Sequence, residues 1–123
     1  MLLLAACSAS SASQIHEALD ARDQAIEAQD AGAYSWLIAD DYSDGELDKV
    51  GVVARMIGLF DQFDDIRIES FSRELRFLDD DHAQCVQSYR MTVAVDDISQ
   101  EIVQRESLSL ARSQNRWLIV GGL

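Results

Sequence analysis

The spacing of apolar residues changes once along this chain, and that change constrains the fold more than any other feature. Up to about residue 65 the apolar side chains recur with the helical period of 3.6, and beyond it they alternate with polar ones. Short turns rich in Asp, Ser and Asn divide the second half at 79–82, 96–100 and 113–115. Because turns this short join only antiparallel strands, the chain predicts an α+β domain whose helices precede a four-stranded antiparallel meander.

Three helices are expected in the first half of the chain. The first covers 14–30, with Ser13 as its N-cap, and a shorter one covers 33–40. Ser43 and Glu46 have the spacing of a capping box, so the third helix is expected to begin there and to end near residue 63.

The third helix is predicted to bury one apolar face. The residues expected to point inward are Val50, Val53, Met56, Ile57 and Phe60. Gly51 and Gly58 lie seven residues apart on one face, and each weakens a helix by about 1 kcal/mol relative to alanine. We therefore expect another backbone to approach closely at these glycines.

The sheet is predicted to bend within its first strand. The four strands are expected at 66–77, 85–95, 102–110 and 116–120. In the first of them the apolar residues switch phase between Ile68 and Phe71, so that Phe71 shares the phase of Leu75. This switch predicts a β-bulge near Glu69 or Ser70. The helices must cover one face of this bent sheet, because each element has a single apolar face to bury.

Length, charge and cysteine content exclude several classes of protein. The 123 residues fit one domain, expected at 14–123. A formal net charge of -12 repels phosphate groups, so neither nucleic acid nor an anionic membrane surface is an expected partner. Cys7 and Cys85 form neither a metal-binding pair nor a disulfide framework, and we predict no metal and no cofactor. Cys85 is expected in the core.

Residues 1–13 contain a second informative string. The sequence Leu4-Ala5-Ala6-Cys7 resembles the lipobox of bacterial lipoproteins, in which the cysteine becomes lipid-modified, and a Ser/Ala run follows it. The resemblance implies lipidation at Cys7, a flexible tether over 8–13, and a periplasmic-side envelope location with membrane contact only through the lipid. Only six residues precede Cys7 and none is basic. Either the true signal is longer, or the match is chance and the protein is cytoplasmic.

Several strings in the body of the chain occur in a familiar order. They are Ile15-His16-Glu17-Ala18-Leu19, Asp30-Ala31-Gly32, Leu37-Ile38-Ala39-Asp40-Asp41-Tyr42 and Asn115-Arg116-Trp117-Leu118-Ile119. From about residue 14 onward the chain resembles the nuclear transport factor 2-like superfamily, also described as a cystatin-like cone. The resemblance implies a bent sheet wrapped around the first helix, with a cavity between them. The stretch after Tyr42 is too short for the hairpin that many members have there, which counts against a complete active site.

The implied cavity can be lined by polar residues that fall on inward phases. The candidate pocket residues are Arg22, Tyr34, Gln87, Tyr89, Gln104 and Glu106. Arg22 lies on the apolar stripe of the first helix, and Glu106 on the apolar phase of the third strand. Since buried polar groups need partners, an Arg22–Glu106 pair across the cavity is expected. Alternatively, the edge of the stripe reaches solvent and these side chains extend into water.

Two enzyme patterns of the superfamily can be compared with the sequence. An isomerase would need a carboxylate base such as Asp40 or Asp41, with Tyr34 or Tyr89 as hydrogen-bond donor. A dehydratase would need inward histidines. His16 and His82, however, are expected on the surface, because one begins the first helix and the other lies in an Asp-rich turn.

The favoured hypothesis is a non-enzymatic module that binds a small apolar or polar ligand or a protein, tethered to the bacterial envelope. The alternative is a small-molecule isomerase or dehydratase-like enzyme that uses the cone pocket. The resemblance also implies a homodimer formed through the sheet. The outward phase that would form it is polar, so its interface would be wet, and comprises Arg90, Thr92, Arg105, Ser107 and Ser109.

Overall fold

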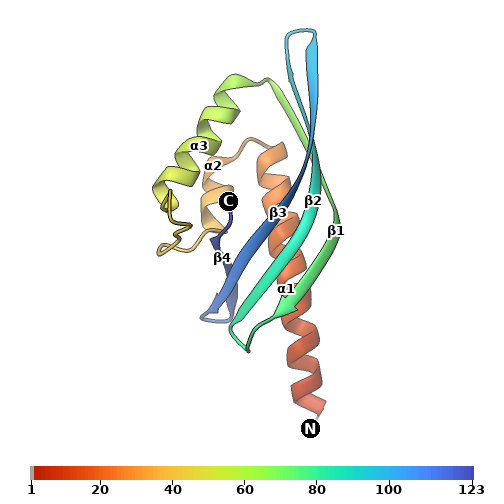
Figure 1. Cartoon of the computed structure of the whole chain (residues 1–123), viewed down its shortest axis with the longest axis vertical. Coiled ribbons are helices and arrows are strands. Elements are labelled where there is room, and N and C mark those ends of the chain that lie inside the picture. The colour runs from red at the N-terminus through yellow and green to blue at the C-terminus, as the bar shows by residue number, and fades with distance from the viewer. Residues whose placement is uncertain (1) are drawn as a thin grey trace.

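The computed structural model describes residues 2–123, with side chains from residue 11 onward, and contains three helices and one sheet (Figure 1). The elements are α1 (Leu2–Glu27), α2 (Ala31–Trp36), α3 (Lys49–Gln62), β1 (Asp65–Phe77), β2 (His82–Val95), β3 (Ile98–Ser113) and β4 (Arg116–Gly121). The strands pair antiparallel in the order β1-β2-β3-β4. The predicted α+β class and the four-stranded meander are confirmed.

The first helix is longer than predicted. It begins at Leu2, so Ser13 lies inside α1 and is not its N-cap. Leu and Ala are among the strongest helix formers, and neither Gly nor Pro interrupts residues 2–27. The Ser/Ala segment expected as a tether is therefore helical. The side chain of Cys7 lies outside the described side chains, and its lipidation stays a prediction. None of the helices over residues 2–123 combines the length and apolar character needed to cross a membrane.

The second helix is shorter than predicted and ends at Trp36 rather than near residue 40. Beyond it the main chain pairs with β4, because Ile38 forms a parallel bridge with Ile119. The amide of Ala39 donates to the Ile119 carbonyl at 3.0 Å, and the Ile119 amide donates to the Leu37 carbonyl at 2.9 Å. The backbone amide and carbonyl groups that a longer α2 would have bonded within the helix are therefore bonded to β4 instead.

The third helix starts later than the capping-box spacing predicts. Its N-cap is Asp48, and the Asp44 carboxylate accepts from the main-chain amide of Glu46 at 3.1 Å. Ser43 pairs with Asp48 in an isolated antiparallel bridge instead of capping a helix. Asp44 and Asp48 therefore form the turns that the sequence analysis attributed to Ser43 and Glu46.

The late start of α3 changes which of its side chains face inward. Val52 is buried, and Met56 and Leu59 pack partly against the core, at helical spacings of four and seven residues. Val50 and Ile57 are 76% and 42% exposed, so their predicted inward placement is wrong.

The glycines of α3 do not mark a close backbone contact, so that prediction is also wrong. A Cβ atom at Gly51 would meet the side chain of Leu47 at 3.0 Å, and one at Gly58 would meet nothing within 4 Å. The open space beside Gly58 belongs to the pocket described below.

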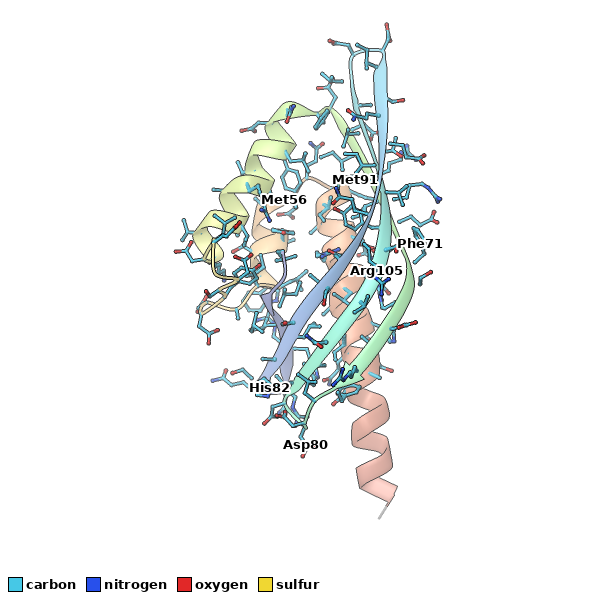
Figure 2. The ribbon with its side chains drawn as sticks, in the orientation of Figure 1. Met56, Phe71, Asp80, His82, Met91 and Arg105 are labelled. Atoms are coloured by element: carbon cyan, nitrogen blue, oxygen red, sulfur yellow. The ribbon has the colours of Figure 1, made fainter. Side chains whose placement is uncertain are left out.

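The predicted β-bulge exists but lies later in β1. The register with β2 shifts after Phe71, and Ser72 adopts a left-handed φ of 55°. Even-numbered residues face the helices before the bulge, and odd-numbered ones, such as Leu75, face them after it. Phe71 therefore lies on the outer face, where the Arg90 guanidinium carbon is 5.5 Å from its ring centroid (Figure 2). The predicted shared phase of Phe71 and Leu75 is wrong.

The dense core lies between the middle of α1, around Ile15 and Leu19, and the strands β2 to β4. Ile15 and Leu19 of α1 are completely buried, as is Leu108 of β3. Cys85 also lies in this core, as predicted, and burial raises the pKa of its thiol. Other core members are Ala83, Leu110, Trp117 and Ile119. This packing fixes α1 against the sheet and so positions the polar side chains farther along the helix.

Candidate ligand-binding site

A pocket of about 840 Å³ lies between α3 and the inner face of the sheet, with α1 and α2 also contributing. Its apolar lining consists of Ile26, Met56, Leu59, Ile68 and Met91. Its principal polar lining consists of Arg22, Tyr34, Arg55, Tyr89, Gln104 and Glu106. Figure 2 labels Met56 on α3 and Met91 on β2, the two elements that face each other across this space. The volume lies within the range of roughly 300–1,000 Å³ typical of small-molecule sites.

The predicted Arg22–Glu106 pair is present and forms one wall of the pocket. The two guanidinium Nη atoms donate to the two carboxylate oxygens of Glu106, at 3.0 and 2.6 Å. The side chains are 3% and 12% exposed. Burial lowers the pKa of Arg22, but the hydrogen bond and charge of Glu106 more than offset this and raise it above its ordinary value. The pair is therefore a fixed, mutually neutralised feature of the wall.

Gln87 connects this pair to a second polar cluster. Its Nε2 donates to Glu106 at 2.8 Å, and its Oε1 accepts from Arg73 Nε at 2.7 Å. Arg73 also donates to Asp20 at 3.1 Å and contacts His16 Nδ1 at 3.2 Å. Gln87 was predicted to line the pocket, but it is completely buried and supports Glu106 from behind. The sequence analysis did not consider Arg73, although its position two residues before Leu75 was an available signal for an inward side chain.

Asp23 is a partly buried carboxylate beside the pocket, 16% exposed, that the sequence analysis also missed. Its Oδ2 accepts from Ser70 Oγ at 2.7 Å, and its Oδ1 lies 3.8 Å from Arg22 Nη2. Burial raises the pKa of Asp23, and the Ser70 hydrogen bond and the charges of Arg22 and Arg73 offset only part of that rise. Asp23 is adjacent to the apolar stripe of α1 rather than on it, so helical periodicity did not identify it.

The two predicted tyrosines lie on different elements and both line the pocket. Tyr34 comes from α2 and Tyr89 from β2, and the Tyr89 hydroxyl donates to Gln104 Oε1 at 3.0 Å. Burial raises the pKa of both hydroxyls. At neutral pH they are therefore uncharged groups that can donate hydrogen bonds to a ligand. The structure thus brings Arg22, Tyr34, Tyr89, Gln104 and Glu106 to one pocket, while their contact with a ligand stays a prediction.

The contribution of α3 to the pocket was only partly anticipated. Met56 was predicted to point inward, but Arg55 was not considered. Arg55 follows Val52 by three residues and precedes Leu59 by four, which is the spacing of neighbours on one helix face. That spacing was the available signal. The Arg55 guanidinium donates to the main-chain oxygen of Leu123.

The histidines and the aspartates considered for enzyme chemistry lie outside the pocket. His16 is exposed, as predicted, and His82 is exposed beside Asp79 at 2.9 Å. Asp40 and Asp41, the candidate bases of an isomerase, are also exposed and do not line the pocket. Among the side chains described from residue 11 onward, no group of three or more His, Cys, Asp or Glu converges to hold a metal ion.

Comparison with known proteins identifies the fold. No protein-family profile and no curated protein matches the chain. A solved hexachlorocyclohexane dehydrochlorinase, LinA type 2, superposes with a TM-score of 0.81 at 10% identity, covering 94% of this chain and 84% of its own. A candidate scytalone dehydratase of Novosphingobium aromaticivorans gives 0.84 at 6% identity, covering 96% and 85%.

A third structure, a candidate dehydratase of the NTF2-like family from Streptomyces avermitilis, gives a TM-score of 0.76 at 14% identity. The aligned region covers 92% of this chain and 94% of that one. The chain therefore has the nuclear transport factor 2-like fold that the sequence strings indicated. At these identities the likeness concerns the fold alone.

Proposed function

We propose that this domain is a non-enzymatic binding module that holds a small molecule in the pocket between α3 and the sheet. The observation that carries the proposal is the state of Glu106, the carboxylate that lines the pocket among the described side chains. Its two oxygens accept three hydrogen bonds, two from Arg22 and one from Gln87. A carboxylate engaged in this way is a poor general base, because a base needs a free oxygen within reach of the substrate proton.

The lining supports recognition of a molecule with an apolar body and at least one polar group. Side chains such as Met56, Leu59 and Met91 offer apolar surface, whose burial contributes about 25 cal/mol per Å². The Tyr34 and Tyr89 hydroxyls can orient the polar group. Methionine side chains adapt their shape to a ligand, which suits a pocket that accepts related molecules.

A second candidate function is an enzyme of the dehydratase or isomerase kind. It is favoured by the fold neighbours, which are named as a dehydrochlorinase and candidate dehydratases. In that case the tyrosine hydroxyls would act as donors, and Asp23, with its raised pKa, is the carboxylate best suited to proton transfer. Asp23 does not line the pocket, so the reaction would require a shift of Arg22.

A bulky residue at Gly58 tests the binding proposal, because the space beside Gly58 is open and belongs to the pocket. We expect native mass spectrometry of the protein purified from cells to show a bound small molecule that denaturation releases. Gly58→Leu should lose that molecule while keeping the fold by circular dichroism. Ala54→Leu, at an exposed position on the same helix, is the matched control and should retain it.

The alternatives give different results in the same experiment. A molecule retained equally by Gly58→Leu and wild type would place the binding site elsewhere. Conversion of the released molecule to an unsaturated or rearranged product by the wild-type protein, and loss of that conversion in Asp23→Asn, would establish the enzyme reading.

We further propose, from the lipobox-like string alone, that Cys7 carries a lipid that anchors the domain on the periplasmic side of a bacterial membrane. Denaturing mass spectrometry of the protein from its native host should show a diacylglycerol-sized addition on a chain that begins at Cys7. An unmodified Cys7 inside a longer chain would contradict the anchor.

A further inference from the structure

One side of β3 lacks a neighbouring strand over much of its length. β2 pairs with β3 over residues 98–111, whereas β4 pairs with it only over 109–113 (Figure 1). Gly122 then lies close to the main chain of Ser107 and covers it. Among the described residues, no other strand pairs with residues 98–106 of β3 on this side. We call this segment the free edge.

The free edge presents a row of main-chain groups that no strand bonds. The Arg112 amide donates to the Asp81 carbonyl on the β2 side at 2.8 Å, so even-numbered residues of β3 direct their main-chain groups toward β2. The register with β2 has no shift, and this direction alternates along an antiparallel strand. The amides and carbonyls that point to the free edge are therefore those of Ser99, Glu101, Val103 and Arg105. Such a row can bond to another strand.

The opposite edge of the sheet is built differently. β1 is interrupted by the bulge after Phe71 and by the left-handed Ser72, a device that disfavours pairing with a further strand. The free edge of β3 has neither a register shift nor a proline. It also exposes apolar surface, since Ile98 and Val103 are 71% and 54% exposed. These features suit it to pairing with another strand.

The free edge is complementary to itself. Its midpoint is Ile102, so two copies that use the whole segment pair antiparallel about a two-fold axis at that residue. Glu101 of one copy then lies diagonally across from Arg105 of the other on the outer face, within reach of two long side chains. Glu101 contacts Arg90 at 3.4 Å but is 58% exposed, and Arg105 takes part in no ion pair among the described side chains. An axis at Glu101 or at Arg105 would set like charges opposite each other.

We propose that the chain forms a two-fold symmetric homodimer in which the free edges of two copies pair antiparallel and join the two sheets into one. This contact uses the edge of the sheet, unlike a dimer formed through its outer face, and it does not depend on the binding function proposed above. It also reaches the pocket, because Gln104 and Glu106 belong to the free edge and line the pocket. Ile98 of the partner subunit lies opposite Glu106 in this pairing, so its exposed apolar side chain covers part of the pocket rim.

An exchange of charges across the axis tests the dimer by sedimentation velocity over a concentration series. The wild-type protein should form a reversible dimer. Glu101→Arg and Arg105→Glu each set like charges across the axis, and each should raise the dissociation constant of the dimer by about tenfold. An equimolar mixture of the two variants restores opposite charges and should dimerise about as tightly as the wild type. Glu69→Arg makes the same charge change on β1, away from the free edge, and should remain as dimeric as the wild type.

Hydrogen exchange followed by NMR distinguishes edge pairing from a contact through another surface. The amides of Glu101 and Val103 should exchange slowly in the dimer and fast in the monomeric variants. The amides of Ile102 and Gln104, which face β2, should exchange slowly in both states and so report an intact fold.

Two results would overturn the edge-paired dimer. One is a wild-type protein that stays monomeric over the whole concentration series. The other is a dimer that persists unchanged in both single variants while the amides of Glu101 and Val103 exchange fast, since the contact would then lie on another surface. Neither result bears on the ligand pocket, which Gly58→Leu tests in a separate experiment.

Discussion

The inner face of the sheet is filled at one end and hollow at the other, although the same helix runs along both. Ile15 and Leu19 of α1 are completely buried against the strands, as is Leu108 of β3. One turn later on the same stripe, Arg22 meets Glu106, and beyond them the pocket begins. The comparison teaches that one charged residue in an apolar stripe can mark where a core ends, because its partner takes the place of an apolar contact.

The two ends also differ in what closes them. At the filled end, α1 packs directly against the strands. At the hollow end, α3 borders the pocket and is held by polar contacts, such as that of Arg55, in the middle of the helix, with Leu123. Gln29 holds the C-terminal end of α3, since its Nε2 donates to the carbonyls of Phe60 and Phe63 at 2.9 Å each. A helix held by a few polar contacts can leave a cavity beneath it.

The largest effect on stability is expected from removing one partner of the Arg22–Glu106 pair, which lies between the filled end and the hollow end. Glu106→Ala leaves the Arg22 guanidinium buried without its counter-ion, and should lower the free energy of unfolding by about 3–5 kcal/mol. Urea denaturation followed by circular dichroism measures this loss.

The control for this variant replaces both partners. Arg22→Leu combined with Glu106→Leu removes the charges together and should recover most of the stability, because apolar residues often replace a buried ion pair without loss. A Glu106→Ala protein as stable as the wild type would show that the pair is solvated and marks no boundary.

A somewhat smaller effect on stability is expected from truncating one leucine at each end, and it compares the packing of the two ends directly. Leu108→Ala at the filled end should cost about 2–5 kcal/mol, since it leaves a cavity among close neighbours. Leu59→Ala on the pocket wall should cost less than half as much, because its side chain already borders open space. Thermal unfolding of both variants gives the comparison. Equal losses would mean that the pocket is closed in solution and that the two ends are packed alike.

The smallest effect concerns the bulge in β1, which changes the inward phase between the two ends. Ser72 holds a left-handed φ of 55°, a conformation that costs a residue with a side chain about 1–2 kcal/mol. Ser72→Gly should therefore stabilise the fold by up to about 1 kcal/mol, after the greater chain entropy of glycine is subtracted. Ser72→Val, which tolerates this φ poorly, should destabilise it, and differential scanning calorimetry can compare the two. Stabilisation by valine would contradict the assigned backbone conformation.

The sequence predicted the structure correctly where a single apolar periodicity dominated a segment. It predicted the structure incorrectly where two local signals, such as neighbouring capping residues, competed. The alternation after residue 65 predicted the meander, and the stripe containing Arg22 predicted its pairing with Glu106. The start of α3 was misplaced because Ser43 and Asp48 are both good caps, and only the bridge between them decides the choice. Position 72 is a serine rather than a glycine or asparagine, so the sequence does not mark its left-handed conformation. The position of the bulge follows instead from the register between β1 and β2.

The pocket wall could not be predicted from the pattern of α3 for a different reason. An apolar helix face has the same sequence whether it packs onto a core or borders a cavity. Met56 was therefore correctly placed inward, but nothing in its spacing indicated that open space would lie before it. Arg55 lines the same pocket as Tyr34 and Tyr89, which come from distant parts of the chain, and only the folded structure shows that they meet there.

The contact of Gln29 holds one end of α3, a helix that borders the cavity, from a position outside the cavity. Gln29 itself adopts a left-handed φ of 54° just beyond α1, and its single amide group holds two carbonyls of the last turn of α3. The distance between the ends of these two helices is thus set by the length of one glutamine side chain. Gln29 does not line the pocket, so the width available to a ligand can change through substitutions that leave every contact surface of the site unaltered.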